Sequence, residues 1–165
     1  MPDATDLPFG SASFDFATAF MSMMDIADHG AALREAARVL RPGGFLQFSI
    51  LHPCFVTPHR GVLREPDATT PAIEVAGYFD TIDGRIDTFR FEKAPQDERE
   101  KTEPFRVPRF HMTLSRWVEL IVAAGLVIEA FGEPRVSVEI AKAEPALEDT
   151  LVAPIFLHIR GRKPA

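Results

Sequence analysis

Hydrophobic residues gather into two regular regions of the chain, and the first runs from residue 14 to residue 51. Phe14–Phe20 is β-prone and mostly apolar, which predicts a strand buried on both faces, as in a parallel sheet. Asp28 is the predicted N-cap of a helix that reaches residue 40. A Pro-Gly-Gly sequence at 42–44 then turns the chain into a second buried strand over residues 45–51. These elements make a βαβ unit whose helix is indicated by apolar residues at helical spacing: Leu33, Ala36, Ala37 and Leu40.

The second regular region begins at Thr113, the predicted N-cap of a helix that ends before Gly125. Residues 126–131 follow as a strand. Residues 145–151 are a candidate short helix, and residues 155–159 form the last predicted strand. Together the two regions predict an α/β domain whose sheet has about four main strands.

A proline-rich insertion at about 53–112 separates the two regions. Residues 73–79 and 85–91 are its candidate strands, joined as a hairpin by Asp83-Gly84, a dipeptide that favours tight turns. Its aromatic residues have two interpretations, because they can form the small core that such a lobe needs or line an apolar ligand pocket. They are Phe55, Tyr78, Phe79, Phe89, Phe91, Phe105 and Phe110.

Composition narrows the class of protein. The chain has 165 residues, 46% of them hydrophobic, which is enough for one domain over 1–165 with a sizeable core. No apolar stretch approaches the roughly 18 residues of a membrane span, so we expect no membrane partner. A net charge of −6 without a basic run argues against nucleic acid as a partner. The single cysteine favours a reducing compartment, and we expect a cytoplasmic protein with a small-molecule partner.

Three motifs in the first region carry a resemblance to a known family. Residues 3–9 are DATDLPF, residues 13–15 are SFD, and residues 35–44 are EAARVLRPGG. In this order they resemble the class I S-adenosylmethionine-dependent methyltransferases of the small-molecule, type 11-like kind. That family has a Rossmann-like sheet of seven strands in the order 3-2-1-4-5-7-6. The resemblance implies that this chain supplies strands 4, 5, 7 and 6, with an inserted β-rich lobe.

The chain also departs from the family pattern. A glycine-rich GxGxG loop, which normally lies upstream of the LPF segment, cradles the cofactor in the family, and no GxGxG occurs here. We therefore expect a single truncated methyltransferase domain, the C-terminal part only, without that loop.

The resemblance implies a set of cofactor-binding residues for S-adenosylmethionine. The first is an aspartate that accepts a hydrogen bond from the adenine amino group, and the backbone of the next two residues meets the edge of the ring. Three residues at the end of the first strand lie near the sulfonium and the amino acid part. The six are Asp3, Ala4, Thr5, Ala19, Phe20 and Met21.

A histidine at the end of the second strand, His52, is the candidate catalytic base, and His111 is the second choice. The alternative for His52 is a His-Pro turn with a solvated imidazole. The histidines show no spacing typical of a zinc site, so we expect no metal.

Two functional hypotheses remain. One is a methyltransferase that acts on an unidentified small molecule and is incomplete as this chain. The alternative is a non-catalytic remnant of the fold that dimerises or binds a partner. If strands 1 to 3 are missing, Phe14–Phe20 becomes an apolar sheet edge, and such edges tend to pair. We therefore expect a homodimer formed through this strand.

Overall fold

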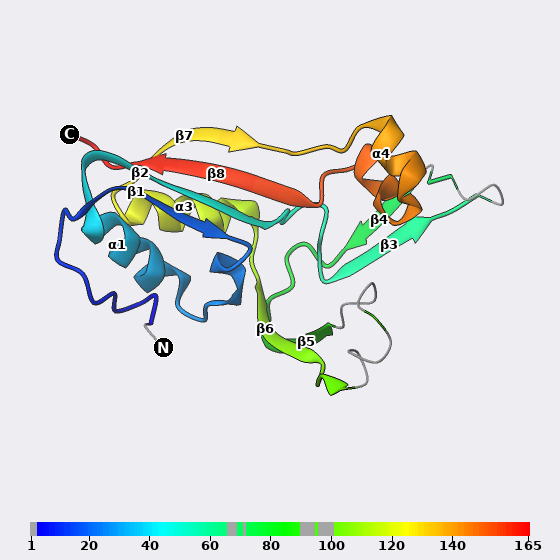
Figure 1. The fold of residues 1–165 in the computed structure, drawn as a ribbon, viewed down its shortest axis with the longest axis horizontal. Coiled ribbons are helices and arrows are strands. Elements are labelled where there is room, and N and C mark those ends of the chain that lie inside the picture. Colours follow the sequence, from blue (N-terminus) through cyan, green and yellow to red (C-terminus); the bar gives the residue numbers. More distant parts are fainter. Residues whose placement is uncertain (1–2, 66–68, 71, 90–94, 96–100) are drawn as a thin grey trace.

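The computed structural model describes residues 3–65, 69–70, 72–89, 95 and 101–165. Its centre is a four-stranded sheet in the order β1-β2-β8-β7 (Figure 1). β1 and β2 are parallel, whereas β8 is antiparallel to both of its neighbours. The expected α/β fold with about four main strands is confirmed. The strands are β1 (Phe14–Phe20), β2 (Leu40–Leu51), β8 (Phe156–Arg162) and β7 (Val127–Gly132).

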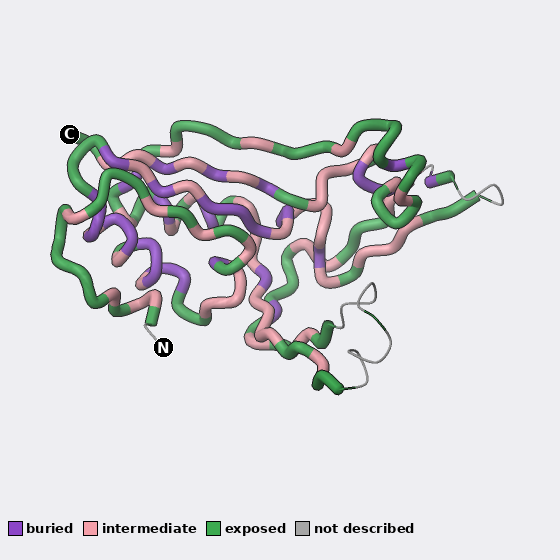
Figure 2. The backbone as a smooth tube through the Cα atoms, viewed as in Figure 1, coloured by how far each residue is buried: buried purple, intermediate pink, exposed green. Residues whose placement is uncertain are grey.

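Two helices, α1 (His29–Val39) and α3 (Leu114–Ala123), contact each other and the sheet. Both begin at the predicted N-caps. The Asp28 carboxylate accepts from the amide three residues later at 2.8 Å, and the Thr113 hydroxyl does the same at 3.2 Å. The apolar stripes of the helices close a core over β2 and β8, purple in Figure 2. The largest fully buried apolar side chains of this core are Leu33, Leu40, Leu46, Phe48, Ile50, Ile121 and Ile159.

The prediction that β1 is buried on both faces is wrong. Ala17 and Ala19 pack against the core, but the side chains that alternate with them point to the opposite face. Phe16 and Phe20 on that face are 58% and 59% exposed. Within the described residues β1 is also an edge strand, with β2 as its one neighbour. The described helices cover only one face of the sheet, so the apolar side chains on the other face of β1 are exposed to solvent.

The glycine turn lies inside β2 rather than before it. β2 begins at Leu40, and its regular pairing with β1 begins only at Phe45, so residues 41–44 bulge out of the ladder. Gly43 has a left-handed φ of +79°, which favours glycine. A Cβ on Gly44 would lie 2.8 Å from a backbone oxygen of β1, so that position needs glycine for close approach.

The insertion forms two antiparallel hairpins in place of the single hairpin that the sequence predicts. β4 pairs with β3 and β5 pairs with β6, so the two candidate strands belong to different hairpins. Asp83-Gly84 lies within β5, where the register shifts, rather than at a turn. Phe91 falls outside the described residues. The strands are β3 (His59–Leu63), β4 (Ala72–Ala76), β5 (Ile82–Phe89) and β6 (Phe105–His111).

Three short helical segments join these parts: η1 (Met23–Asp25), α4 (Val138–Ala143) and η2 (Pro145–Leu151). η2 confirms the expected short helix, whereas α4 has no counterpart among the predicted elements. Arg60 of β3 pairs with Asp149 of η2 at 2.6 Å, and β6 lies beside η1 (Figure 1). None of the helices in the described ranges has the length and apolar character that a bilayer crossing requires.

Candidate functional site

Three strand ends meet at one edge of the central sheet. β1, β2 and β7 run in the same direction, because β8 is antiparallel both to β2 and to β7. The residues that directly follow the three strands, Met21, His52 and Glu133, therefore reach the same edge. Open α/β sheets bind their ligands outside the carboxyl ends of the strands, so this edge is the first place to look for a site.

His52 is buried at this edge, with 3% of its surface exposed. Its Nδ1 accepts from the Cys54 amide at 3.2 Å, and its Nε2 lies 3.0 Å from Oε1 of Glu133. Because Nδ1 accepts a hydrogen bond, a neutral imidazole carries its proton on Nε2. The Nε2–H group then donates a hydrogen bond to Oε1 of Glu133. The Glu133 side chain is 56% exposed, so the pair presents a carboxylate to solvent. The alternative of a solvated imidazole at His52 is wrong, because the imidazole is buried.

Asp3, Ala4 and Thr5 lie in a tight turn that precedes β1. Oδ1 of Asp3 accepts from the amide of Thr5 at 2.9 Å and from its hydroxyl at 2.8 Å. These two hydrogen bonds lower the pKa of Asp3, because both stabilise the charged carboxylate. The bond from the amide has the larger effect. Ala4 packs against the core. The turn therefore presents a fixed negative charge.

Two side chains of α1 hold the segment that carries this turn. Oε2 of Glu35 accepts from the Leu7 amide at 2.9 Å, and Arg38 donates to the carbonyls of Leu7 and Phe9 at 3.1 and 2.8 Å. Arg38 also donates two hydrogen bonds to the Glu35 carboxylate. These bonds, and to a lesser degree the bond from the Leu7 amide, lower the pKa of Glu35 to about 2. The segment before β1 is thereby fastened to the helix that follows β1.

The chain turns sharply where β1 ends. Met21 has a left-handed φ of +49°, and its amide donates to both the carbonyl and the hydroxyl oxygen of Ser49, at 3.1 and 3.0 Å. A non-glycine residue in this conformation costs on the order of 1 kcal/mol, and such residues cluster at functional sites. Phe20 before it is exposed, and Ala19 is half-buried against the core.

Two groups of these residues fit S-adenosylmethionine, the cofactor that the resemblance implies. Within the described residues the side-chain hydrogen bonds of Asp3 use Oδ1 alone, so Oδ2 remains to accept from an adenine amino group. The structure brings Phe20 and Met21 to the sheet edge with His52. Asp3 lies in the turn before β1, where its hydrogen bonds are with Thr5 and Asp6.

A groove of about 640 Å³ lies beside Met21, between the sheet edge and the β5–β6 hairpin. Its charged residues are Asp25 of η1 and two residues of the hairpin, Asp87 and Arg109, which form an ion pair at 3.1 Å. Burial, and to a lesser degree repulsion by Asp87, raises the pKa of Asp25. Most of the lining is apolar: Met21, Met24, Leu51, Phe89, Phe105 and Val107.

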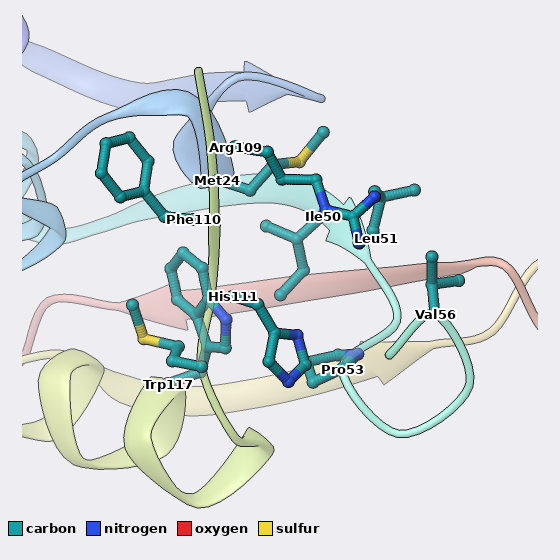
Figure 3. Close-up of a pocket in the computed structure, with 10 residues that line it drawn as sticks. Met24, Ile50, Leu51, Pro53, Val56, Arg109, Phe110, His111 and Trp117 are labelled. Carbon is teal, nitrogen blue, oxygen red and sulfur yellow. The ribbon is translucent and has the colours of Figure 1, made fainter. Parts of the chain in front are cut away.

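A second cavity, of about 20 Å³, shares Met24, Leu51 and Arg109 with the groove (Figure 3). Figure 3 shows Arg109 and His111 on one side of β6 and Phe110 on the other, as the alternation of a strand requires. Nε2 of His111 donates to the Tyr78 carbonyl at 3.2 Å, and burial lowers the pKa of His111. His111 is 7% exposed and faces a cavity that has room for about one water molecule.

The aromatic residues of the insertion divide between their two interpretations. Phe89 and Phe105 are 55% and 62% exposed and line the groove. Phe110 instead packs edge-on against His29, with ring centroids 5.7 Å apart, and Phe55 lies 4.8 Å from the ring of His52. Phe79 is 85% exposed and belongs neither to the core nor to the groove, so each interpretation holds for only part of the set.

Sequence reasoning missed four charged residues of these sites. Asp25 alone left a signal, as the one charged residue in the apolar stretch after β1. The other three become neighbours of the site only through pairing between distant strands, which no local pattern reveals. The four are Asp25, Glu133, Asp87 and Arg109. Among the described residues no group of three or more His, Cys, Asp or Glu side chains is arranged to hold a metal ion.

Sequence comparison finds relatives for the first region of the chain. Residues 1–48 match the family model of a methyltransferase domain. The O-methyltransferase cnsE of Penicillium expansum is 49% identical over 59 residues, which are 34% of this chain and 21% of that protein. A demethylmenaquinone methyltransferase of Mycolicibacterium vanbaalenii is 52% identical over 44 residues, 27% of this chain and 19% of that protein. The matched segment spans about a fifth of the length of these relatives.

Structural comparison extends over nearly the whole chain. An S-adenosylmethionine-dependent methyltransferase from Mesorhizobium loti superimposes with a TM-score of 0.71 at 22% identity. The match covers 98% of this chain and 67% of that one. At this identity the likeness concerns the fold.

Proposed function

We propose that this chain, which carries part of a class I S-adenosylmethionine-dependent methyltransferase domain, serves the transfer of a methyl group to a small molecule. The observation that carries the proposal is the family match over residues 1–48, which spans the Asp3 turn, β1, α1 and most of β2. Those elements hold all six residues that the resemblance assigns to the cofactor.

The order of the central sheet supports the proposal. The order β1-β2-β8-β7 agrees with strands 4, 5, 7 and 6 of the family's Rossmann-like sheet if the four are taken in turn. Under this correspondence the edge with Met21 and His52 is the cofactor edge. The groove beside it, walled by the insertion, then holds the methyl acceptor.

Each candidate residue has a role in this scheme. Oδ2 of Asp3 accepts from the adenine amino group, and the backbone of Ala4 and Thr5 meets the ring edge. Ala19, Phe20 and Met21 face the sulfonium and amino acid parts. S-adenosylmethionine supplies an activated methyl group when bound, and the residues of the chain align the acceptor with it.

For His52 we propose a positioning role that acts through Glu133. The buried imidazole donates from Nε2 to Oε1 of Glu133 and so holds that carboxylate at the cofactor edge. A carboxylate held there can accept hydrogen bonds from a cofactor amino or hydroxyl group. A direct proton transfer to His52 would require the Cys54 amide to release Nδ1.

Calorimetric titration of the chain with S-adenosylhomocysteine, the demethylated product, tests the proposal. We expect saturable binding at one site per chain. Asp3→Ala should weaken it about tenfold, because one charge-assisted hydrogen bond is lost. Asp83→Ala, which removes an exposed carboxylate from β5, is the matched control and should leave the affinity unchanged.

The alternative function, a dimerising or partner-binding remnant of the fold, is favoured by one observation. The outer face of β1 exposes Phe16 and Phe20, and its edge is unpaired within the described residues. The same titration separates the two functions. No heat at millimolar S-adenosylhomocysteine, from a sample shown to be folded, would contradict the methyltransferase proposal and leave the remnant.

A further inference from the structure

The two carboxylates of the groove differ in their pairing with cationic side chains. Asp87 is paired twice, because its Oδ1 accepts from Arg85 at 3.0 Å and its Oδ2 from Arg109 at 3.1 Å. Asp25 is half-buried at the end of η1, and its side chain has no hydrogen bond or ion pair within the described residues. One carboxylate of the groove is therefore compensated, and the other faces mainly apolar side chains.

An unpaired carboxylate in such surroundings is unstable in its charged form. Burial removes part of its hydration, and the neighbouring Asp87 repels it, which is why the pKa of Asp25 is raised. The guanidinium of Arg109 lies in the same groove but is engaged by Asp87. A cation that entered the groove would supply the ion pair that Asp25 does not make with any described residue.

We propose that the groove binds a small apolar amine, with its ammonium group on the Asp25 carboxylate and its hydrocarbon body against the groove wall. The volume of about 640 Å³ lies in the range of small-molecule sites. The hydrocarbon body of the amine would bury the exposed rings of Phe89 and Phe105. An acidic or phosphorylated molecule is disfavoured, because it would place a second negative charge against Asp25.

This inference deepens the proposed function and rests on it where it names the amine as the methyl acceptor. An ammonium nitrogen has no lone pair with which to attack a methyl group. Transfer of one proton from the ammonium to the Asp25 carboxylate gives a neutral amine and a carboxylic acid, and the lone pair becomes available. Asp25 is thus assigned both the recognition of the acceptor and its deprotonation.

Calorimetry with two probes of the same shape tests the site. 2-Phenylethylamine carries the ammonium group, and 2-phenylethanol carries a neutral hydroxyl on the same body. Both are titrated into the full chain, its Asp25→Asn variant and the control Asp83→Asn, each with and without saturating S-adenosylhomocysteine. We expect the wild-type chain to prefer the amine. Asp25→Asn should weaken amine binding about tenfold to a hundredfold and leave alcohol binding unchanged.

Three results would overturn the inference: no binding of the amine to the folded chain, equal affinity for amine and alcohol, or equal amine affinity of the wild-type chain and Asp25→Asn. The titration with S-adenosylhomocysteine is independent of the titration with the amine. Binding of S-adenosylhomocysteine without amine binding would overturn the amine site and keep the proposed function. Amine binding through Asp25 without S-adenosylhomocysteine binding would support the site and contradict the proposed function.

Discussion

Replacement of Phe48 by alanine tests whether the core lies on one face of the sheet. Phe48 is fully buried on β2, and its ring centroid lies 5.8 Å from that of Trp117. Phe16 on the neighbouring strand β1 carries the same side chain but is 58% exposed. Phe16→Ala is therefore a matched control, because it removes the same atoms from the adjacent strand at a different burial.

The structure sets the expected difference between the two variants. Truncation of a buried phenylalanine lowers the free energy of unfolding by roughly 3–5 kcal/mol. If this loss is scaled by the fraction of Phe16 that is buried, Phe16→Ala lowers the free energy of unfolding by about 1–2 kcal/mol. With urea m-values of about 1–3 kcal/mol per M, Phe48→Ala lowers the urea midpoint by about 2 M, and Phe16→Ala by less than about 1 M.

Trp117 is the only tryptophan of the chain, so its fluorescence in urea follows the same core. Far-UV circular dichroism provides a second signal that does not depend on the contact between Phe48 and Trp117. At a concentration at which the chain is monomeric, an equal loss in the two variants, or a greater loss in Phe16→Ala, would refute the reasoning, because the outer face of β1 would then be covered within one chain as well as the core.

Two further predictions concern a buried histidine and the free sheet edge. His29 is 5% exposed, its Nε2 has no partner in the described residues, and burial lowers its pKa from 6.5. The folded chain then binds fewer protons than the unfolded chain, so this contribution to stability is fully present above pH 6.5 and is lost as the pH falls through the lower folded-state pKa. His29→Phe should flatten the pH dependence of the urea midpoint below neutrality, and the exposed His59→Gln should not; unchanged slopes in both would contradict the assignment. For the edge, we propose that two copies join through β1, and analytical ultracentrifugation at micromolar concentration should show a dimer that Phe16→Lys weakens, whereas a wild-type monomer would exclude it.

Local sequence signals predicted the regular elements of the two ends. Asp28 and Thr113 mark their helices because an N-cap needs only a side-chain oxygen and the next three residues. Gly125, with a left-handed φ of +80°, marks the end of α3 in the same local way. Each of these signals depends on neighbours within one turn of the chain, so the sequence carries it completely.

Strand pairing in the insertion could not be predicted on that basis. Asp83-Gly84 favours a hairpin locally, yet β5 pairs with β6, which follows it only after residues 90–104. The partner of His52 shows the same limit, because Glu133 lies 81 positions away in the sequence and is brought near by the order of the sheet. His52 itself was found by its place at a strand end, but its burial and bonding depend on those distant contacts.

The candidate cofactor edge and the candidate acceptor groove are built from different parts of the chain. The edge is formed by residues that follow β1, β2 and β7, whose positions depend on the central sheet. The groove takes its outer wall from β5 and β6, which pair with each other and contact the first region mainly through η1. Substitutions in that hairpin can therefore change what the groove accepts without moving the strand ends. Asp25 belongs to η1, where the two parts meet, whereas the other charged residues that line the groove among the described residues, Asp87 and Arg109, belong to the hairpin.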